Sequence, residues 1–597
     1  MADIIRVSDP HRADVRFQDG ALPHLRGVKS WQILRCNRLH PEWADCIGWT
    51  YNHAAMLAHA YGRFFCEYLS NPVDEHEVPG HTMLTSSADG VHWDKPIVAF
   101  PEVEVPTWQY KGPRTPLLKE KMLTVPHQRM GFYYAKNGVL LLLSFYGIVH
   151  DRRRSAPCDG WGVGRAVRRI YPDGTLAENI YFLIYTEPAG YTAENTGVFA
   201  PFRESGDPEL IAACEELLQN GAAMRQMYEE QRFDKTLFPN PAGEALSFYT
   251  TGPDEMLGMY KKGLVAVSHD QGKTWSDVAR QETICTATGK VWGQKTSDGR
   301  YTLMYNPTTD GQHRWPIAAV TGEDGHAFGD MAAITGDMSP QRYGGRDKNL
   351  GPQYMRGIAE CNPQSPDGDV WLAYSNNKED IWISRIPVPL RSVGDAAGEV
   401  RCEAGTLPAE LGVYAPLWAP VEAEDNALVL RDKDPYDQAR IEMAIRPAQR
   451  GTVRFTAEIA ALGDTGALTF ELQDDTGRTP VRLVFRPDGM LYVRGDGRTD
   501  PWQPYETNKP IDVEVSFDCA LTRYTVKALG QEKSFGFSAA VDSLTRFRLM
   551  TKEKIPHLST VDDCGKWGVK EQVLPGGEEP VAESVIRLRD IRWQTEA

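Results

Sequence analysis

Residues suited to acid–base chemistry gather in four segments of the first two thirds of the chain. Each mixes histidine, arginine, aromatic or carboxylate side chains next to an apolar run of strand length, where active-site loops commonly lie. The segments are residues 48–53, residues 69–81, residues 126–130 with 145–154, and residues 353–362 with 374–380.

Two histidines stand out by their surroundings. His53 follows a Gly-aromatic stretch and is a candidate general base, because an imidazole titrates near neutral pH; a core histidine satisfied by backbone groups is the alternative. His76 lies in a loop rich in Asn, Pro and carboxylates. The pattern from His76 to His81 resembles a zinc signature, but the spacing is five and Pro79 precedes a glycine, which prevents the aligning helix. The sequence therefore does not support a zinc site.

Several arginines are suited to holding a carboxylate, since a guanidinium donates two parallel hydrogen bonds. Arg165 and Arg168 begin a strand and are placed to point inward, whereas the run 152–154 is more typical of a solvated loop. Arg356 and Glu360 are an even number of residues apart, so a regular strand would point both to one face. Either they pair with each other or Arg356 faces the pocket.

Other chemistries are excluded by charge and by missing motifs. A net charge of −16 argues against nucleic acid as a partner, although a few arginines can still bind a uronate locally. The G-x-S-x-G elbow and the Walker A motif do not occur, and Gly162 and Gly164 lack the third glycine of a dinucleotide fingerprint. The longest apolar run, 139–145, is too short to cross a membrane.

One motif predicts the fold. Residues 268–275 read SHDQGKTW and match the Asp-box pattern S-x-D-x-G-x-T-W; a shorter variant lies at 87–93 and a degenerate one at 323–328. The Asp and Ser side chains satisfy turn N–H groups, glycine takes a positive φ, and tryptophan packs between sheets. Asp boxes indicate a β-propeller and sit on its outer turns, so we expect Asp270 and Asp89 to be structural.

Short apolar runs alternate with Gly, Pro and Asp turns up to residue 389. A propeller blade takes about 40–50 residues, so residues 1–390 are expected to form a seven-bladed catalytic propeller, with six blades as the alternative. Residues 207–232 have apolar residues at helical spacing, which predicts a short helical insertion that caps the propeller.

The remainder of the chain is expected to be a second all-β module. Residues 391–400 read as a linker, and period-two alternation over residues 401–597 predicts a jelly-roll-like β-sandwich with an accessory role.

The ten cysteines are scattered without a CxxC pair, which is typical of free thiols in a reducing compartment. The first twenty residues show no signal peptide, so we expect a cytoplasmic protein, or a secreted or periplasmic one if a leader has been removed. No cofactor is expected to be required, and a structural calcium ion is compatible with the sequence.

At these segments the chain resembles the seven-bladed propeller enzymes that cleave L-rhamnose from D-glucuronate at α-1,4 linkages. They are classed both as α-L-rhamnosidases of glycoside hydrolase family 145 and as rhamnosyl-glucuronate lyases of polysaccharide lyase family 42. The likeness covers residues 48–389, apart from Ala54, where the family pattern has a second histidine. It rests on YNH at 51–53, SNPVDEH at 70–76, HQRM at 127–130, GVGRAVRRIYPDG at 162–174, EEQR at 229–232, QYMRGIAE at 353–360 and NKEDIWISRIPVP at 377–389.

The resemblance implies a pocket that reads a uronate in an oligosaccharide or polysaccharide, with no nucleic acid or membrane partner. In the lyase form an arginine neutralises the carboxylate, a His or Tyr removes the acidified C5 proton, and a second group protonates the departing rhamnose oxygen. The catalytic candidates are His53, His76, His127 and Tyr146, and the substrate-binding candidates are Asn52, Arg129, Arg165, Arg168 and Arg356.

Three alternatives remain. A hydrolase would use a base to activate water with help from Asp or Glu, but the segments supply more His and Arg than matched carboxylates, which favours elimination. A sialidase-like hydrolase would need an arginine triad, a Tyr–Glu nucleophile pair and an N-terminal Arg-Ile-Pro, and that tripeptide occurs at 385–387 instead. The third alternative is a glycan-binding propeller without catalysis.

Overall fold

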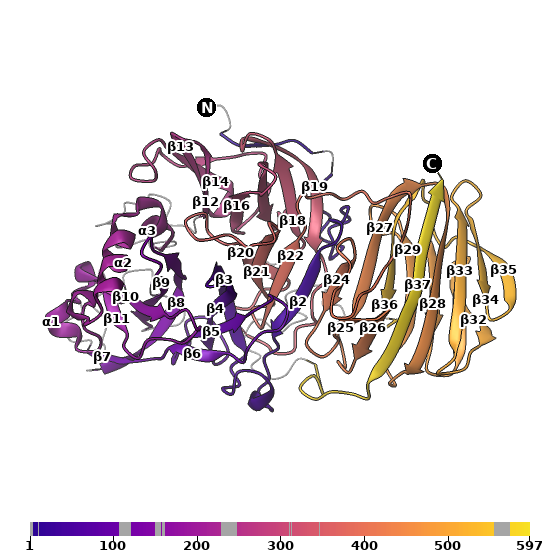
Figure 1. The fold of residues 1–597 in the computed structure, drawn as a ribbon, viewed down its shortest axis with the longest axis horizontal. Helices are drawn as coiled ribbons and strands as arrows, with labels where there is room; N and C mark the ends of the chain where they lie inside the picture. Colours follow the sequence, from indigo (N-terminus) through magenta and orange to yellow (C-terminus); the bar gives the residue numbers. More distant parts are fainter. Residues whose placement is uncertain are drawn as a thin grey trace.

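The computed structural model describes residues 4–9, 11–106, 121–149, 157, 161–227, 247–309, 311, 313–345, 347–553 and 574–596; at 121, 125 and 127–130 only the backbone is described. Two all-β modules lie side by side, a propeller and a sandwich (Figure 1). No helix among the described residues is long and apolar enough to span a membrane.

Within the described residues the propeller consists of five sheets whose strands follow one another from the inside of the ring outward, with the N-terminal β2 closing the last sheet. The first two sheets are β3 (Tyr51–Ala60), β4 (Arg63–Asn71), β5 (His81–Ser87), β6 (Ile97–Phe100); and β8 (Lys121–Tyr134), β9 (Leu140–Ile148), β10 (Gly162–Ile170), β11 (Tyr181–Tyr185). The other three are β12 (Ser247–Gly252), β13 (Glu255–Met259), β14 (Leu264–Ser268), β15 (Ala279–Arg280); β16 (Val291–Lys295), β17 (Tyr301–Tyr305), β18 (Ile317–Gly322), β19 (Ala327–Thr335); and β20 (Pro352–Arg356), β21 (Val370–Asn376), β22 (Asp380–Ile386), β2 (Lys29–Leu34). Two short strands extend them, β7 (Glu104–Pro106) beside β8 and β1 (Arg6–Val7) beside β19.

The described residues thus form five blades, where the length of the chain had predicted seven. The difference arises because the connections between strands are long. Residues 171–227 hold a single strand followed by helices, and residues 336–351 form an irregular connection between two blades. Such connections take up the residues that the prediction had assigned to further blades.

The Asp boxes occupy equivalent turns. Each lies between the third and fourth strands of its sheet: residues 87–93 between β5 and β6, residues 268–275 between β14 and β15, and residues 323–328 between β18 and β19. In the full box Asp270 accepts from Thr274 N–H at 2.8 Å, and Trp275 Nε1–H donates to the Gly272 carbonyl at 2.9 Å. Asp270 and Asp89 are therefore turn-forming residues, as expected.

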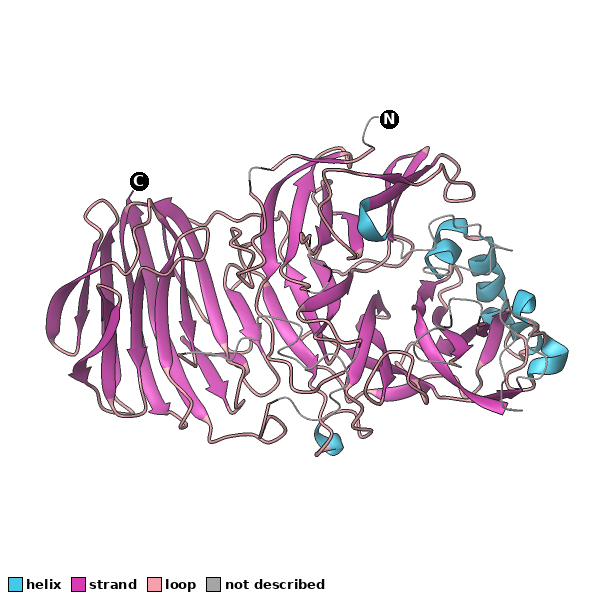
Figure 2. Cartoon of the chain, turned by 180° about the vertical axis from the view of Figure 1, so that it is seen from behind, coloured by secondary structure: helices cyan, strands magenta, loops and turns pink. Residues whose placement is uncertain are grey.

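The helical insertion packs on the outside of the second blade. α2 (Pro208–Gln219) buries Leu210 and Leu217 against that blade, and α3 (Gly221–Met227) buries Met224 there. In Figure 2 most of the helical turns gather at the end of the molecule away from the sandwich. Asp207 caps α2 by accepting from two N–H groups of its first turn. The part of the predicted helix from 228 to 232 lies outside the described residues. The remaining helical turns are α1 (Ala193–Thr196) and the 3-10 turns Pro41–Trp43, Glu187–Ala189, Phe202–Glu204 and Lys261–Gly263.

The sandwich has two sheets of antiparallel strands. One contains β24 (Gly412–Ala415), β27 (Arg440–Ala448), β36 (Leu544–Met550), β29 (Leu468–Gln473), β30 (Val481–Phe485), β31 (Met490–Gly495) and β32 (Arg498–Pro504). The other contains β25 (Val421–Glu424), β26 (Ala427–Asp432), β37 (Ser584–Glu596), β28 (Arg450–Ala461), β33 (Pro510–Asp518), β34 (Arg523–Ala528), β35 (Gln531–Gly536) and, paired with β37, β23 (Ala397–Glu399).

The two modules share a sheet. β2 pairs in parallel with β24, from Lys29 beside Val413 to Trp31 beside Ala415, so the last blade continues into the sandwich as an eleven-stranded sheet. One apolar core runs through both modules and includes Trp31 and Trp371 on one side and Val413 and Phe470 on the other. Within the segment predicted as a linker, residues 397–399 form β23, which pairs with β37.

The eight described cysteines are free thiols, and Cys46 and Cys285 among them are exposed.

Candidate functional site

The strand order decides which loops meet at one end of the propeller. In an antiparallel meander the start of the inner strand and the connection from second to third strand lie at the same end of the blade. The Asp boxes, which connect third and fourth strands, therefore lie at the opposite end. Residues at the starts of β3, β16 and β20 share an end with the β4–β5, β13–β14 and β21–β22 loops.

A group of aromatic and charged side chains meets at this end, and we call it the inner-strand cluster. It brings together residues from six separate segments. Its members are Tyr51, His53, Glu75, Lys261, Lys290, Tyr354 and Lys378.

Aromatic rings form the centre of the cluster. The His53 ring lies 4.2 Å from the Tyr354 ring and 5.8 Å from the Tyr51 ring, measured between centroids. His53, Tyr51 and Tyr354 are all buried. The Oγ of Ser375 lies 2.7 Å from His53 Nδ1, while His53 Nε2 has no hydrogen-bond partner among the described residues.

Three lysines surround these rings. Lys290 and Lys261 place their ammonium groups 4.3 Å and 5.0 Å from the centre of the Tyr354 ring, and Lys378 lies 5.7 Å from that of Tyr51. Such contacts stabilise a cation by the ring quadrupole and leave it able to attract an anion. Lys378 is held in place by Glu75 at 3.3 Å and by the Asp347 carbonyl at 2.7 Å.

The cluster shifts the titration of its own members. Burial lowers the pKa of His53 well below its usual value, with further lowering by Lys378, Lys290 and Lys261, so the imidazole is neutral at physiological pH. Burial, and then the adjacent Glu75 carboxylate, raise the pKa of the Tyr51 hydroxyl well above its usual value. The site therefore combines a neutral base, a protonated phenol beside a carboxylate, and three ammonium groups.

Backbone irregularities sit beside the cluster. The β3–β4 register shifts after His53, where Ala54 has a φ of 56°, and the β20–β21 register shifts after Gln353, where Tyr354 has the same φ. A positive φ at a non-glycine residue is costly and is tolerated where the surrounding packing fixes it. Such bulges redirect side chains, and here they occur on two of the inner strands that supply the cluster.

Of the sequence-predicted residues, His53 is in the cluster and His76 is at its edge. His76, with a φ of 64°, follows Glu75 in the β4–β5 loop, and its Nε2 lies 3.8 Å from the Glu75 carboxylate.

Asn52 is buried and links the first blade to the last. Its side-chain amide donates to the Glu379 carbonyl at 2.9 Å, and its N–H donates to the Lys378 carbonyl at 2.9 Å. These bonds hold the β21–β22 loop beside β3, which is a supporting position for the cluster.

Tyr146 and Arg168 lie elsewhere. The Tyr146 hydroxyl donates to the Pro101 carbonyl at 2.6 Å within a core of aromatic rings, and burial raises its pKa well above the usual value. Arg168 donates to the carbonyls of Ala177 and Ala99 at 2.5 Å and 2.7 Å. Both side chains connect blades in the interior, and neither is brought into the inner-strand cluster.

Arg165 and Arg356 lie deeper in the propeller. Arg165 is buried, donates to the Met227 carbonyl at 3.2 Å and lies 4.7 Å from the Phe145 ring. Arg356 is buried near Trp292 and lines a small cavity. Glu360 binds the N–H and hydroxyl of Thr250, and β20 ends at Arg356, so the strand geometry that would pair these two residues is not formed.

His127 and Arg129 lie on β8, but their side chains are outside what the structure describes.

Sequence reasoning missed the three lysines, Glu75, Tyr51 and Tyr354. The available signal was positional: Tyr51, Glu75, Tyr354 and Lys378 all fall inside the segments quoted above for their polar residues. Lys261 and Lys290 gave no such signal, because both lie outside those segments.

Among the described residues no three His, Cys, Asp or Glu side chains are placed to hold a metal ion.

Comparison with known proteins places this geometry in a class. Residues 3–243 match a family model described as a BT_1020-like N-terminal beta propeller, and residues 412–564 match one described as a sialidase-like CBM domain. No curated protein matches the sequence of this chain. The chain is thus a β-propeller joined to a β-sandwich, and the sandwich is similar to a sialidase-like carbohydrate-binding domain.

A solved structure titled "Sialidase" is 34% identical over 99% of this chain, with a TM-score of 0.89. The chain covers 54% of that protein and therefore spans about half of its length. A Trypanosoma rangeli sialidase mutant displaying trans-sialidase activity aligns over 96% of this chain and 97% of its own, at 10% identity and a TM-score of 0.35.

Proposed function

We propose that this chain is a glycan-active hydrolase whose substrate carries a carboxylate on or next to the sugar that it cleaves. The observation that carries the proposal is the convergence of Lys261, Lys290 and Lys378 on the rings of Tyr51 and Tyr354. The protein as a whole carries a net charge of −16, so three lysines gathered at one end of the propeller create a local positive potential that favours an anion.

The chemistry of the cluster fits an acidic sugar. Aromatic side chains are common in sites that bind sugars, and the ammonium groups that lie over the Tyr51 and Tyr354 rings can bind a carboxylate. The cations are lysines and not the arginine triad expected of a sialidase, so binding would depend on point charges more than on two-pronged hydrogen bonds. Rhamnosyl-glucuronate ends and other uronates or acidic keto-sugars are candidate substrates.

Tyr51 and Glu75 supply a route for hydrolysis. The phenol can attack the anomeric carbon while the Glu75 carboxylate accepts its proton; the glycosidic bond breaks, and the aglycone leaves as its alcohol after taking a proton from water. Water then attacks the same carbon, the glycosyl–tyrosine bond breaks, and the phenol regains its proton from Glu75. A neutral nucleophile has an advantage here, because a carboxylate would be repelled by a negatively charged substrate. The similarity to a protein titled "Sialidase" favours hydrolysis over elimination.

Elimination is a second candidate, and the state of His53 favours it. Its imidazole is neutral, and its Nε2 has no partner among the described residues, as a base that removes a C5 proton requires. The neighbouring lysines would then acidify that proton by neutralising the uronate carboxylate.

The test is a panel of substrates incubated with the full chain. We would use a rhamnose-capped glucuronide, a sialoside and a neutral rhamnoside of matched aglycone. Release of an intact acidic sugar, or of rhamnose with an unchanged glucuronide, supports hydrolysis. New ultraviolet absorbance from an unsaturated uronate supports elimination. Binding without turnover indicates a lectin, and cleavage of the neutral rhamnoside alone contradicts the proposal.

Two substitutions separate the routes. Tyr51→Phe removes the phenol and should lower kcat at least about 100-fold in a hydrolase, while His53→Gln should do so in a lyase. Tyr249→Phe is the matched control: its hydroxyl donates to the Gly325 carbonyl in an Asp-box turn at the opposite end of the propeller, and activity should be unchanged. Equal activity of all three variants would rule out the inner-strand cluster as the active site.

A lysine substitution tests the carboxylate. Lys290→Met should raise KM for an acidic substrate about 10-fold, because one buried ammonium group is lost from the anion site. Lys295→Met, at the other end of the same strand, should leave KM unchanged.

A further inference from the structure

Besides the shared sheet, one short segment of the sandwich contacts the propeller. Gly577 and Glu578 precede β37 and lie against the residues that follow β2. The Gly577 carbonyl accepts from Arg35 at 2.9 Å, and the Glu578 carbonyl accepts from Asn37 at 2.8 Å. Arg35 itself pairs with Asp434 at 3.0 Å and stacks 3.7 Å from Trp418, so the contact is anchored on both sides.

The Glu578 carboxylate is the most highly connected group of this segment. One of its oxygens accepts from the Tyr343 hydroxyl at 2.8 Å, from Leu39 N–H at 2.9 Å and from Arg38 N–H at 3.1 Å. Hydrogen bonds to a charged acceptor are about twice as strong as neutral ones, so this carboxylate fixes the Tyr343 side chain.

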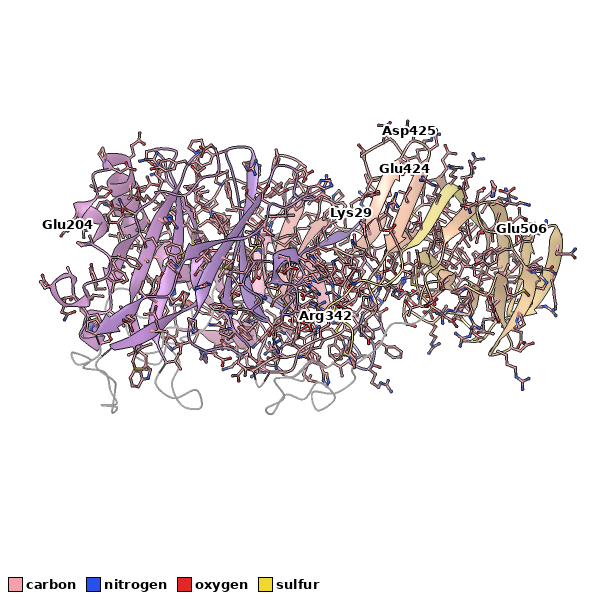
Figure 3. The ribbon with its side chains drawn as sticks, turned by 90° about the horizontal axis from the view of Figure 1, so that it is seen from below. Lys29, Glu204, Arg342, Glu424, Asp425 and Glu506 are labelled. Carbon is pink, nitrogen blue, oxygen red and sulfur yellow. The ribbon has the colours of Figure 1, made fainter. Side chains whose placement is uncertain are left out.

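Tyr343 belongs to the connection between the fourth and fifth blades, residues 336–351. Its N–H donates to the Glu379 carboxylate at 2.8 Å, and Lys348 pairs with the same carboxylate at 3.0 Å with both groups fully buried. Arg342 forms a buried ion pair with Asp380 and lies where the propeller meets the sandwich (Figure 3). These bonds tie the connection to the β21–β22 loop.

The same two segments hold Lys378. Its ammonium group donates to the Asp347 carbonyl, and its neighbour Glu379 is the residue bound by Tyr343 and Lys348. A continuous series of bonds therefore runs from Glu578 through Tyr343 and Glu379 to the β21–β22 loop and Lys378.

We propose that Glu578 is a positioning residue, by which the sandwich sets the place of Lys378 in the inner-strand cluster. The inference rests on the proposed function in one respect, which is that Lys378 binds the substrate carboxylate. The sandwich is then part of the functional unit, in addition to any binding of glycan on its own.

Glu578→Gln and Tyr343→Phe test the proposal. Each keeps the size of the side chain and weakens the bond between the modules. Because small misplacements of a binding group have large effects, kcat/KM for the acidic substrate should fall about 10-fold, mainly through KM. The double variant should be no worse than either single one, since both remove the same link.

The neighbouring Glu579→Gln is the matched control. The Glu579 side chain is 64% exposed, and its ion pair with His40 is long, at 3.7 Å. The kinetic constants of Glu579→Gln should therefore be unchanged. A pure stability effect would lower the amount of folded enzyme without moving KM. Unchanged KM in both Glu578→Gln and Tyr343→Phe overturns the proposal.

Hydrogen exchange provides a readout independent of substrate. Amides of residues 342–345, 347–351 and 376–380 should exchange faster in Glu578→Gln than in the wild type or in Glu579→Gln, while those of 261–263 should not change. If the wild type acts on no probe, the proposed function fails, and faster exchange in these segments still supports positioning. Unchanged exchange there overturns it.

Discussion

At the scale of single residues, the carboxyl of Glu67 is unusual. It is fully buried on β4, and neither oxygen has a hydrogen-bond partner of normal geometry among the described residues. Burial raises its pKa well above the usual 4.5, which the Gly131 N–H only partly offsets. The folded protein therefore holds Glu67 protonated, and the group costs stability because it is desolvated without compensation.

Replacing Glu67 with Met should stabilise the fold. A methionine of similar length removes the buried polar group, and a gain of about 1–3 kcal/mol at pH 7 is expected. In the wild type, Glu67 contributes most favourably to the free energy of unfolding below pH 4.5, where its carboxyl is protonated in the unfolded chain as well. This contribution is lost as the pH rises through the raised pKa of Glu67 in the folded protein. The gain measured by urea unfolding should thus grow from pH 5 to pH 8, and a gain independent of pH would contradict this account.

Residue roles were only partly predictable from the sequence. Tyr146 and Arg168 had the right chemistry and lay near strands, but their polar groups bind backbone carbonyls of neighbouring segments, which no spacing rule indicates. Strand periodicity tells which residues share a face, but not which blade covers that face. His53 was found because its segment was unusual, whereas Lys261 and Lys290 acquire a role only once six segments meet.

At the scale of elements, an Asp-box turn interlocks with a helix. Gly272 has a φ of 81°, and a Cβ there would lie 2.8–2.9 Å from Ala222 in α3. The box therefore fixes its own hairpin and also supports the helical insertion.

Gly272→Ala should destabilise the fold more than Gly299→Ala. Both glycines have similar positive φ values, 81° and 87°, so both variants lose about 1 kcal/mol from backbone strain. In Gly272→Ala the new methyl group also contacts α3, and this overpacking adds about 1–3 kcal/mol of destabilisation. In Gly299→Ala it does not, because nothing lies within 4 Å of a Cβ at that position. Equal shifts in thermal midpoint would show that the contact with α3 is not maintained in solution.

Element types were easier to predict than their number. The Asp boxes and the apolar periodicity of α2 are local signals, and both features formed where they were expected. The blade count depends on how many residues the connections use, and residues 171–227 resemble blade-length sequence while holding mostly helix. Likewise, residues 397–399 appear too small and polar to be a strand until β37 supplies their partner.

At the scale of the molecule, the shared sheet and core should make unfolding cooperative. β2 pairs with β22 on one side and with β24 on the other, so unfolding of either module would leave an unpaired strand edge on the other module. We expect a single calorimetric transition. Val413→Pro removes the bond from Val413 N–H to the Val28 carbonyl and should lower that single midpoint by an amount equivalent to about 3 kcal/mol. Two separated transitions in the wild type would contradict this.

The place of β2 in the ring also has a consequence for the growing chain. This strand leaves the ribosome early, yet its partner β22 begins at Asp380 and β24 at Gly412. At about 5–20 residues per second, the wait is on the order of tens of seconds, during which the backbone N–H and C=O groups on both edges of β2 lack their partner strands. A nascent protein of this design would need a chaperone or slow, guarded release until translation has passed the first strand of the second module.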